Sequence, residues 1–312
     1  MNQRIDAFLA YLHRERSLSP NTCAAYRNDL YQFAEYLAEA AGRQGSTGFA
    51  LATVDRERLG GYFLTLRERG YSPASIARKV AAVRQFFRYL KLAGEVATDP
   101  TAGLGSPEVK KAPPRTASAS DVRTLLTRTE ARETPEGLRD GTMLRLLYAT
   151  GMRVSELVML DLTDVDFDQA RARVVGRGGR ERSVPLDAVT LAALRSYIDT
   201  ARPFLVRNAP AQTALIVNQR GQRLTRQGFW LIMKALVKDS GLANTITPHT
   251  LRHSFATHQI GEGLALEQLR QLLGHASIAS TLVYCQLIER LSNGELTADP
   301  AVHRRLVLSG GA

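Results

Sequence analysis

Apolar residues recur every three or four positions through the first hundred residues, which is the spacing of one face of an α-helix. Four such runs are separated by polar stretches, and they cover residues 5–12, 26–37, 59–66 and 76–90. The fourth run is the clearest, because Ser72 can cap a helix and Pro73 suits its first turn. The pattern therefore predicts four helices within residues 1–103.

The helical pattern stops between residues 99 and 117, where four prolines and two glycines disfavour regular structure. Lys110, Lys111 and Arg115 make this stretch basic. It suits a strap that crosses a DNA backbone, and it equally suits an ordinary linker. We expect a first domain over residues 1–103, a linker over 104–117 and a second domain over 118–312.

The second domain combines helical runs with short β signals. A capped helix is expected at Ser120 and Asp121, and a longer one over residues 138–148. Strands are expected over 165–167, 172–175 and 181–184, with residues 176–180 as a hairpin tip. Further helices are expected to begin near Asp187, Thr225, Pro248, Leu264 and Ser277. The fold class is mainly α, with a small antiparallel β-sheet in the second domain.

Composition narrows the class of protein. A chain of 312 residues exceeds the usual size of a single core, which favours two domains. No apolar run is long enough to cross a membrane, and no apolar stretch follows the N-terminus as in a signal peptide. Two cysteines provide no disulfide framework, which favours the cytoplasm. The net charge of +11 indicates a polyanionic partner, with nucleic acid as the first expectation.

Basic residues occupy the polar faces of the second and fourth predicted helices. A single arginine there is most simply a solvated surface residue, but several along one helix favour contacts with a DNA backbone. The candidate DNA contacts, together with the two linker lysines, are Arg27, Arg78, Lys79, Arg84, Arg88, Lys110 and Lys111.

Three segments of the second domain carry residues suited to breaking a phosphodiester without a metal. Guanidiniums bind phosphate oxygens, imidazoles move protons near neutral pH, and a phenol can attack phosphorus. Tyr284 follows His275 by nine positions. The full set is Arg153, His249, Arg252, His275 and Tyr284.

Each of these residues also has a simpler interpretation. An arginine such as Arg153 is often a capping residue, and Glu156 can be a surface charge or can orient Arg153. His249 and His253 are four apart, as in zinc-binding helices, but Thr250 stands where a metalloprotease helix has Glu. We therefore expect no metal, and we interpret His253 and His258 as packing or hydrogen-bonding residues.

The order Arg, His-x-x-Arg, Gly-His and Tyr resembles the tyrosine site-specific recombinases of the phage integrase family, in particular the Xer type. The resemblance covers residues 5–284. It implies a four-helix SAM-like DNA-binding domain followed by a catalytic domain, with Arg153 and Arg252 on the phosphate and Tyr284 as nucleophile. His249 would accept the phenol proton, and His275 would assist. It also implies no cofactor, a cytoplasmic protein at the nucleoid, and double-stranded DNA with inverted repeats as partner.

The same resemblance implies a homo- or hetero-tetramer on DNA, with a paralogous recombinase or accessory protein as a further partner. The biological role would be dimer resolution of chromosomes or plasmids, or integration and excision of a mobile element. Residues 301–308 would form a helix that docks on a neighbouring protomer, or else a frayed end.

One position departs from the family pattern. The family has a lysine in the hairpin tip that assists the departing 5′ oxygen, and this chain has Arg177. Arginine keeps the charge, but with a pKa of roughly 12.5–13.8 it is a poorer proton donor than lysine at about 10.4. Arg177 could therefore stabilise the leaving oxygen electrostatically. Alternatively, the chain could be an attenuated or silent DNA-binding paralogue.

Overall fold

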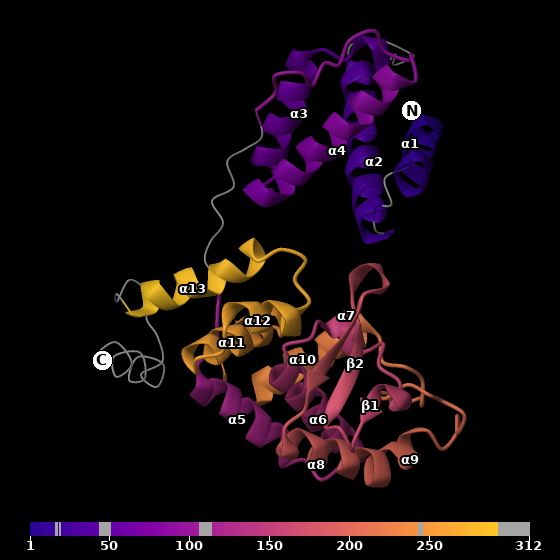
Figure 1. The fold of residues 1–312 in the computed structure, drawn as a ribbon. Coiled ribbons are helices and arrows are strands. Elements are labelled where there is room, and N and C mark those ends of the chain that lie inside the picture. Colours follow the sequence, from indigo (N-terminus) through magenta and orange to yellow (C-terminus); the bar gives the residue numbers. More distant parts are fainter. Residues whose placement is uncertain (16–17, 19, 44–50, 106–113, 243–245, 293–312) are drawn as a thin grey trace. The chain divides into compact units, whose positions relative to one another are not determined.

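A computed structural model describes the chain except residues 16–17, 19, 44–50, 106–113, 243–245 and 293–312. It divides into two compact units, Met1–Lys111 and Ala112–Ala312. The first unit contains the helices α1 Asn2–Glu15, α2 Pro20–Arg43, α3 Arg56–Glu68 and α4 Pro73–Leu92, with a short 3₁₀ turn, η1, at Leu51–Thr53 (Figure 1). Lys110, Lys111 and residues 301–308 lie outside the described residues.

The four helices of the first unit pack around a shared aromatic and aliphatic core. Phe33 lies between Tyr62 and Phe87, with ring centroids 5.0 and 6.3 Å away. The helix starts follow local chemistry, since Asp55 caps α3 and Ser72 caps α4 through their side chains. The apolar face predicted for each helix is the face that the structure buries.

The expectation of one exposed basic face on α4 is wrong at Lys79. Its side chain is buried, and its ammonium donates to Asp29 at 2.9 Å and to Gln32 at 2.5 Å. Arg78 also donates to Asp29, at 2.5 Å, although its side chain is partly exposed. A buried carboxylate needs a paired cation, so Lys79 stabilises the packing of α2 against α4 and is not available to DNA.

The second unit is mainly helical. The helices before the hairpin are α5 Ala119–Glu130, α6 Pro135–Thr150 and the one-turn α7 Val154–Leu157. Those after it are α8 Ala188–Ser196, the π-helical turn η4 Tyr197–Ala201, α9 Arg202–Leu205, α10 Arg226–Asp239, α11 Pro248–Gly261, α12 Leu266–Leu273 and α13 Ala279–Ser292. Helix α5 begins earlier than expected, because Ser118 caps it and Ser120 does not.

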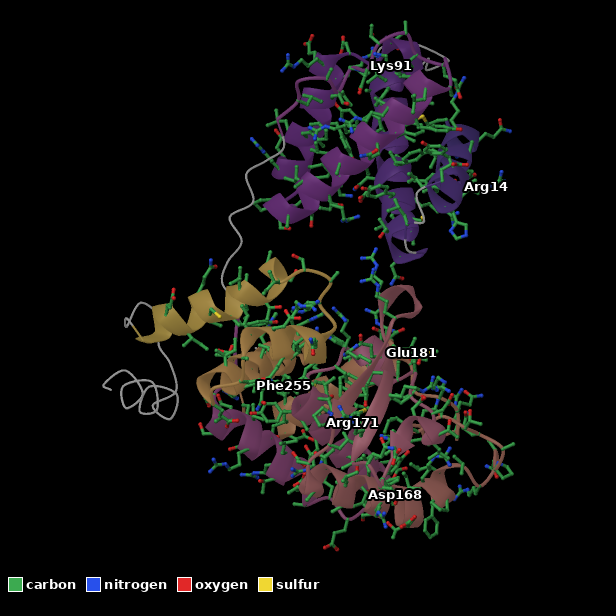
Figure 2. The ribbon with its side chains drawn as sticks, viewed as in Figure 1. Arg14, Lys91, Asp168, Arg171, Glu181 and Phe255 are labelled. Carbon is green, nitrogen blue, oxygen red and sulfur yellow. The ribbon has the colours of Figure 1, made fainter. Side chains whose placement is uncertain are left out.

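An antiparallel sheet lies on one side of these helices, in the order β1-β2-β3 (Figure 1). Its strands are β1 Val165–Asp166, β2 Arg171–Val175 and β3 Glu181–Pro185, preceded by the 3₁₀ turn η2 Leu162–Asp164. Ala172 pairs with Val184 and Val174 with Arg182. The 3₁₀ turn η3, Arg177–Gly179, forms the hairpin tip. Figure 2 shows Arg171 and Glu181 on the two hairpin strands and Phe255 on α11.

The fold class is the expected one, a mainly helical chain with one small antiparallel sheet among its described residues. Val174 and Val184 join the sheet to the large core of the second unit, while α11, α12 and α13 share a smaller core around Phe255 and Tyr284. No described helix is long and apolar enough to cross a membrane.

Candidate active site

Arg153 is the N-cap residue of α7 and comes immediately after a sharp turn. Helix α6 ends at Thr150 and is capped by Gly151, whose φ of 58° is the left-handed conformation that glycine tolerates best. A Cβ at Gly151 would come within 2.2 Å of the Phe255 ring, so this position also needs glycine for space. The Arg153 backbone N–H donates to Glu156 Oε2 at 2.7 Å, and its Nη1 donates to Glu156 Oε1 at 2.9 Å. The turn therefore fixes where this guanidinium lies.

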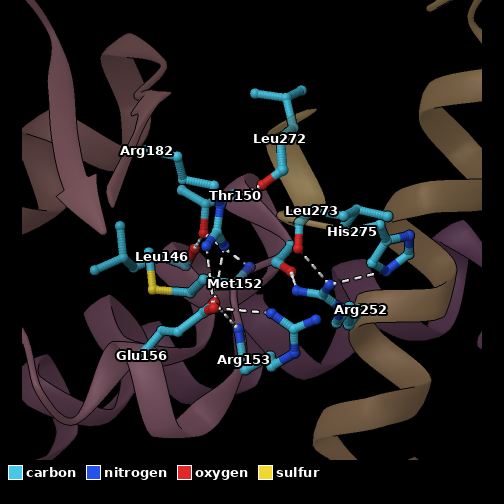
Figure 3. Close-up of polar contacts among 11 residues, drawn as sticks. Leu146, Thr150, Met152, Arg153, Glu156, Arg182, Arg252, Leu272, Leu273 and His275 are labelled. Atoms are coloured by element: carbon cyan, nitrogen blue, oxygen red, sulfur yellow. Dashed lines mark hydrogen bonds and ion pairs between the residues drawn. The ribbon is translucent and has the colours of Figure 1, made fainter. Parts of the chain in front are cut away.

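Glu156 is shared by two arginines (Figure 3). Besides Arg153, it accepts from Arg182 of β3, at 3.0 Å to Oε1 and 2.8 Å to Oε2. Burial alone would raise the pKa of Glu156, but hydrogen bonds from Arg182 and the Arg153 backbone, with the charges of both guanidiniums, lower it. Arg182 also donates to the carbonyl of Leu272 at 2.7 Å. Glu156 and Arg182 thus connect α7, the hairpin and the end of α12.

Arg252 is a buried guanidinium held by the backbone. Its Nη1 donates to the Gly151 carbonyl at 2.5 Å, and its Nη2 donates to the Leu273 carbonyl at 2.7 Å (Figure 3). Burial, followed by the charge of Arg153, lowers the pKa of Arg252 to about 10. It remains protonated at neutral pH. Two cations therefore lie close enough to repel each other, an arrangement that favours a bound anion.

His275 follows the turn that ends α12. Its Nε2 lies 3.2 Å from Arg252 Nη2, and its Nδ1 lies 2.9 Å from Thr281 Oγ1. Because the guanidinium can only donate, Nε2 accepts and Nδ1 carries the proton. Burial, together with the charges of Arg252 and Arg153, lowers the pKa of His275 to about 4. The imidazole is therefore neutral in the free protein near neutral pH.

Tyr284 lies on α13 beside two imidazoles, those of His275 and His253. Its ring is nearly parallel to that of His275, at 11° and 6.4 Å between centroids. Its hydroxyl lies 3.0 Å from Nδ1 of His253. Burial raises the pKa of Tyr284, while Arg252 and Arg153 oppose that effect. The phenol is consequently protonated at neutral pH and requires an acceptor before it can act as a nucleophile.

An open groove of about 750 Å³ runs between the hairpin tip and the turn that carries His275. Arg153, Arg177 and His275 line it, so the hairpin position that departs from the family pattern faces the same space as two of the candidate catalytic residues. Three further arginines contribute to its walls, namely Arg180, Arg182 and Arg270. The groove suits a strongly anionic ligand such as a phosphodiester.

The structure thus brings most of the predicted site residues together. Arg153, Arg177 and His275 line the groove, Arg252 hydrogen-bonds His275, and the Tyr284 ring stacks beside that of His275. His249 is exposed in the first turn of α11, and no hydrogen bond joins it to Tyr284 within the described residues. Over the same residues, no group of three or more His, Cys, Asp or Glu side chains is placed to hold a metal.

The candidate DNA contacts differ in their exposure. Arg27 and Arg88 are exposed on α2 and α4, and Arg78 is partly exposed beside Asp29. Arg84 is half-buried and donates to the Leu104 carbonyl at 2.6 Å. Among the members of the set that the structure describes, Arg27 and Arg88 are exposed, whereas Arg78, Lys79 and Arg84 make hydrogen bonds within the first unit.

Two residues of the site were not expected to belong to it. Arg182 sits on the inner face of β3 with Val184, and the two-residue period of a strand was a signal that could have indicated this. His253 had been interpreted as a packing or hydrogen-bonding residue. The structure gives it a hydrogen bond to the Tyr284 hydroxyl itself.

Comparison with known proteins identifies the family of this chain. The profile described as "Phage integrase family" matches residues 116–290, and "Phage integrase, N-terminal SAM-like domain" matches residues 5–94. The chain belongs to the phage integrase family.

Within that family the chain is similar to the Xer tyrosine recombinases. It is 44% identical to tyrosine recombinase XerC of Roseiflexus castenholzii, over 97% of this chain and 93% of that protein. It is 40% identical to tyrosine recombinase XerD of Listeria innocua, over 91% and 94%. The crystal structure of XerH bound to its palindromic difH substrate in a post-cleavage complex has the same fold, with a TM-score of 0.74 and 20% identity over 90% of this chain and 80% of that one.

Proposed function

We propose that this protein is a site-specific DNA recombinase that cuts and rejoins strands by transesterification at Tyr284. The observation that carries the proposal is the packing of Tyr284 against His275, which also contacts Arg252 at the wall of an arginine-lined groove. A phenol, a neutral imidazole and fixed cations at one place are suited to phosphoryl transfer. The 40–45% identity to XerC and XerD proteins supports the same activity.

In this reaction the scissile phosphate lies against Arg153 and Arg252. The Tyr284 oxygen attacks phosphorus, the bond from phosphorus to the 5′ oxygen breaks, and a 3′-phosphotyrosyl ester and a 5′-hydroxyl result. Attack by the 5′-hydroxyl of a partner strand reverses the step. One ester replaces another, so the exchange needs no ATP. The two guanidiniums supply the positive charge that phosphoryl transfer needs in its transition state.

Arg252 and Arg153 would contribute differently to phosphate binding. The contacts that Arg252 makes with the Gly151 and Leu273 carbonyls and with His275 use three of the five N–H groups of its guanidinium. Arg153 commits one side-chain N–H to Glu156 and is partly exposed toward the groove. Arg252 is thus the more rigid of the two, and Arg153 has more donors to offer a substrate.

Arg177 would stabilise the departing 5′ oxygen. It lies at the exposed tip of the hairpin and lines the same groove as Arg153 and His275. Its charge favours a developing oxyanion, whereas its high pKa makes full proton transfer slow. Double-stranded DNA at an inverted-repeat site is the proposed substrate, bound by both domains, with a tetramer as the active assembly.

The biological role we propose is dimer resolution, on the strength of the Xer relatives. Mobile-element integration remains the second candidate, and the DNA sequence beside the encoding locus distinguishes them.

A nicked suicide substrate tests the proposed chemistry, because the cut strand diffuses away and the covalent adduct accumulates. Wild-type protein should form the adduct in the presence of excess EDTA, and Tyr284→Phe should bind DNA without forming it. Tyr148→Phe is the matched control, since Tyr148 is another hydrogen-bonded tyrosine of the same unit, with His258 Nδ1 at 2.8 Å. An adduct that persists in Tyr284→Phe contradicts the assignment. Specific binding by wild type without any cleavage would instead identify a silent DNA-binding paralogue.

A further inference from the structure

The hydroxyl of Tyr284 already has a hydrogen-bond partner in the free protein, and that partner is His253. Nδ1 of His253 lies 3.0 Å from the phenol oxygen, and the two ring centroids are 5.6 Å apart. His253 lies on α11 and Tyr284 on α13, two helices that pack against each other. The contact therefore depends on the tertiary fold, since the two residues are far apart in the sequence.

The surroundings of His253 determine the direction of this hydrogen bond. The charged and titratable groups around it are His249 and Arg252 on α11, Tyr284 on α13 and His275 in the turn before α13. Burial, followed by the charges of His249 and Arg252, lowers the pKa of His253. A neutral imidazole faces a protonated phenol near neutral pH, so the phenol donates and Nδ1 accepts.

His249 does not occupy this position. It precedes His253 by one helical turn, is exposed, and makes no hydrogen bond to Tyr284 within the part of the chain that the structure describes. A proton acceptor must lie within hydrogen-bond reach of the proton that it takes. By that criterion His253 is positioned to accept the proton of the Tyr284 hydroxyl, and His249 is free to contact phosphate.

We propose that His253 accepts the proton of the Tyr284 hydroxyl during strand cleavage. This inference rests on the proposed function. As the Tyr284 oxygen bonds to phosphorus and the 5′ oxygen departs, the phenol proton moves to Nδ1 of His253, and solvent protonates the 5′ oxygen. In rejoining, a 5′-hydroxyl loses its proton to solvent as it attacks, the tyrosyl oxygen leaves phosphorus, and His253 returns the proton to it.

The rate of adduct formation on the nicked substrate tests the proposal through two variants. His253→Gln keeps a hydrogen-bonding side chain that cannot take up a proton, and His253→Ala removes the side chain. Each should bind DNA like wild type and form adduct about 10²-fold more slowly or worse, the usual effect of losing a positioned base. The wild-type rate should level off as pH rises, because His253 becomes neutral. The rate of the variants should keep rising, because their phenol must ionise unaided.

Two rescue measurements separate proton transfer from packing. Added imidazole should accelerate His253→Ala, and a fluorinated tyrosine of lower pKa at position 284 should reduce the defect of His253→Gln. His258→Gln is the matched control, because His258 makes the same kind of contact, Nδ1 to a tyrosine hydroxyl, on the same helix but away from Tyr284. Its rate and pH profile should match those of wild type.

Three outcomes would overturn the inference. Unchanged rates in the His253 variants would mean that another group takes the proton. Faster adduct formation would mean that His253 restrains Tyr284. A slow rate with an unaltered pH profile and no rescue would assign His253 a purely structural role. Failure of the wild type itself to form adduct is a separate result, and it would overturn the proposed function.

Discussion

Arg182 and Glu156 face each other through two parallel hydrogen bonds, Nη1 to Oε1 at 3.0 Å and Nη2 to Oε2 at 2.8 Å. The carboxylate is 3% exposed, and it also accepts from the backbone and side chain of Arg153. A single buried carboxylate therefore sets the position of a proposed phosphate-binding arginine relative to the hairpin that carries Arg177.

We expect Glu156→Gln to lower both stability and cleavage. Removing the charge leaves Arg182 buried without its counter-ion, a loss that costs about 3 kcal/mol or more. Chemical unfolding of the second unit measures the stability, and adduct formation measures the cleavage. Glu267→Gln is the control, because Glu267 is exposed and pairs with Arg270 on the surface of α12. Equal, small effects of the two substitutions would mean that Glu156 does not organise the site.

Arg177→Lys should accelerate cleavage of an ordinary substrate. Lysine at about pKa 10.4 gives up a proton more readily than arginine, so the departing 5′ oxygen is protonated sooner. A 5′-bridging phosphorothiolate has a leaving group that needs little protonation. On that substrate the wild type and Arg177→Lys should converge, and Arg177→Ala should be partly rescued.

Arg171→Lys serves as the control for Arg177, because Arg171 is an exposed arginine of the same hairpin that donates to Ser183. It should change neither rate. If Arg177→Ala is equally defective on both substrates, Arg177 does not act on the leaving group.

Two substitutions on α4 should have different effects, one at Lys79 on stability and one at Arg88 on DNA binding. Lys79→Met removes a buried partner of Asp29 and should destabilise the first unit by about 3 kcal/mol. Arg88→Glu changes an exposed residue, so it should leave stability unchanged, weaken DNA binding and reduce the salt slope by about one or more. Thermal unfolding and binding titrations at several salt concentrations provide both measurements. An unaltered salt slope in Arg88→Glu would make this face a merely solvated surface.

The depressed pKa of His275 predicts a dependence of stability on pH. Its folded value is about 4 and its ordinary value is 6.5, so the unfolded chain binds the proton first as pH falls. Stability should therefore fall between about pH 6.5 and pH 4, where the unfolded state holds more protons. His275→Gln cannot bind that proton, and its stability should change less between about pH 8 and pH 5 than that of wild type. If stability changed by the same amount in both proteins over this pH range, folding would not lower the pKa of His275.

The helices and the sheet were predictable because their local patterns and the tertiary fold agree. Periodic apolar positions and caps such as Ser72 indicated the first unit, and β-branched residues around a glycine-rich tip indicated the hairpin. Lys79 was misplaced although the signal was available, since it lies three residues after Ile76 and so on the apolar face of α4.

The contact partners within the site were harder to predict. Arg182 could have been placed inside the fold from its alternation with Val184. The hydrogen bond between His253 and Tyr284 could not, because it depends on how α13 packs against α11. Spacing in the sequence predicts which residues could carry the chemistry, but the packing of the helices decides which imidazole meets the phenol.

The backbone contacts of Arg252 affect how a cleavage-deficient version of this protein should be made. Lysine cannot reproduce them, because one ammonium replaces a planar group that reaches both the Gly151 and the Leu273 carbonyls. A substitution at Arg252 would therefore alter the scaffold together with the reaction. A version meant only to mark or hold its DNA site is better built as Tyr284→Phe, which gives up a single hydrogen bond and keeps the architecture.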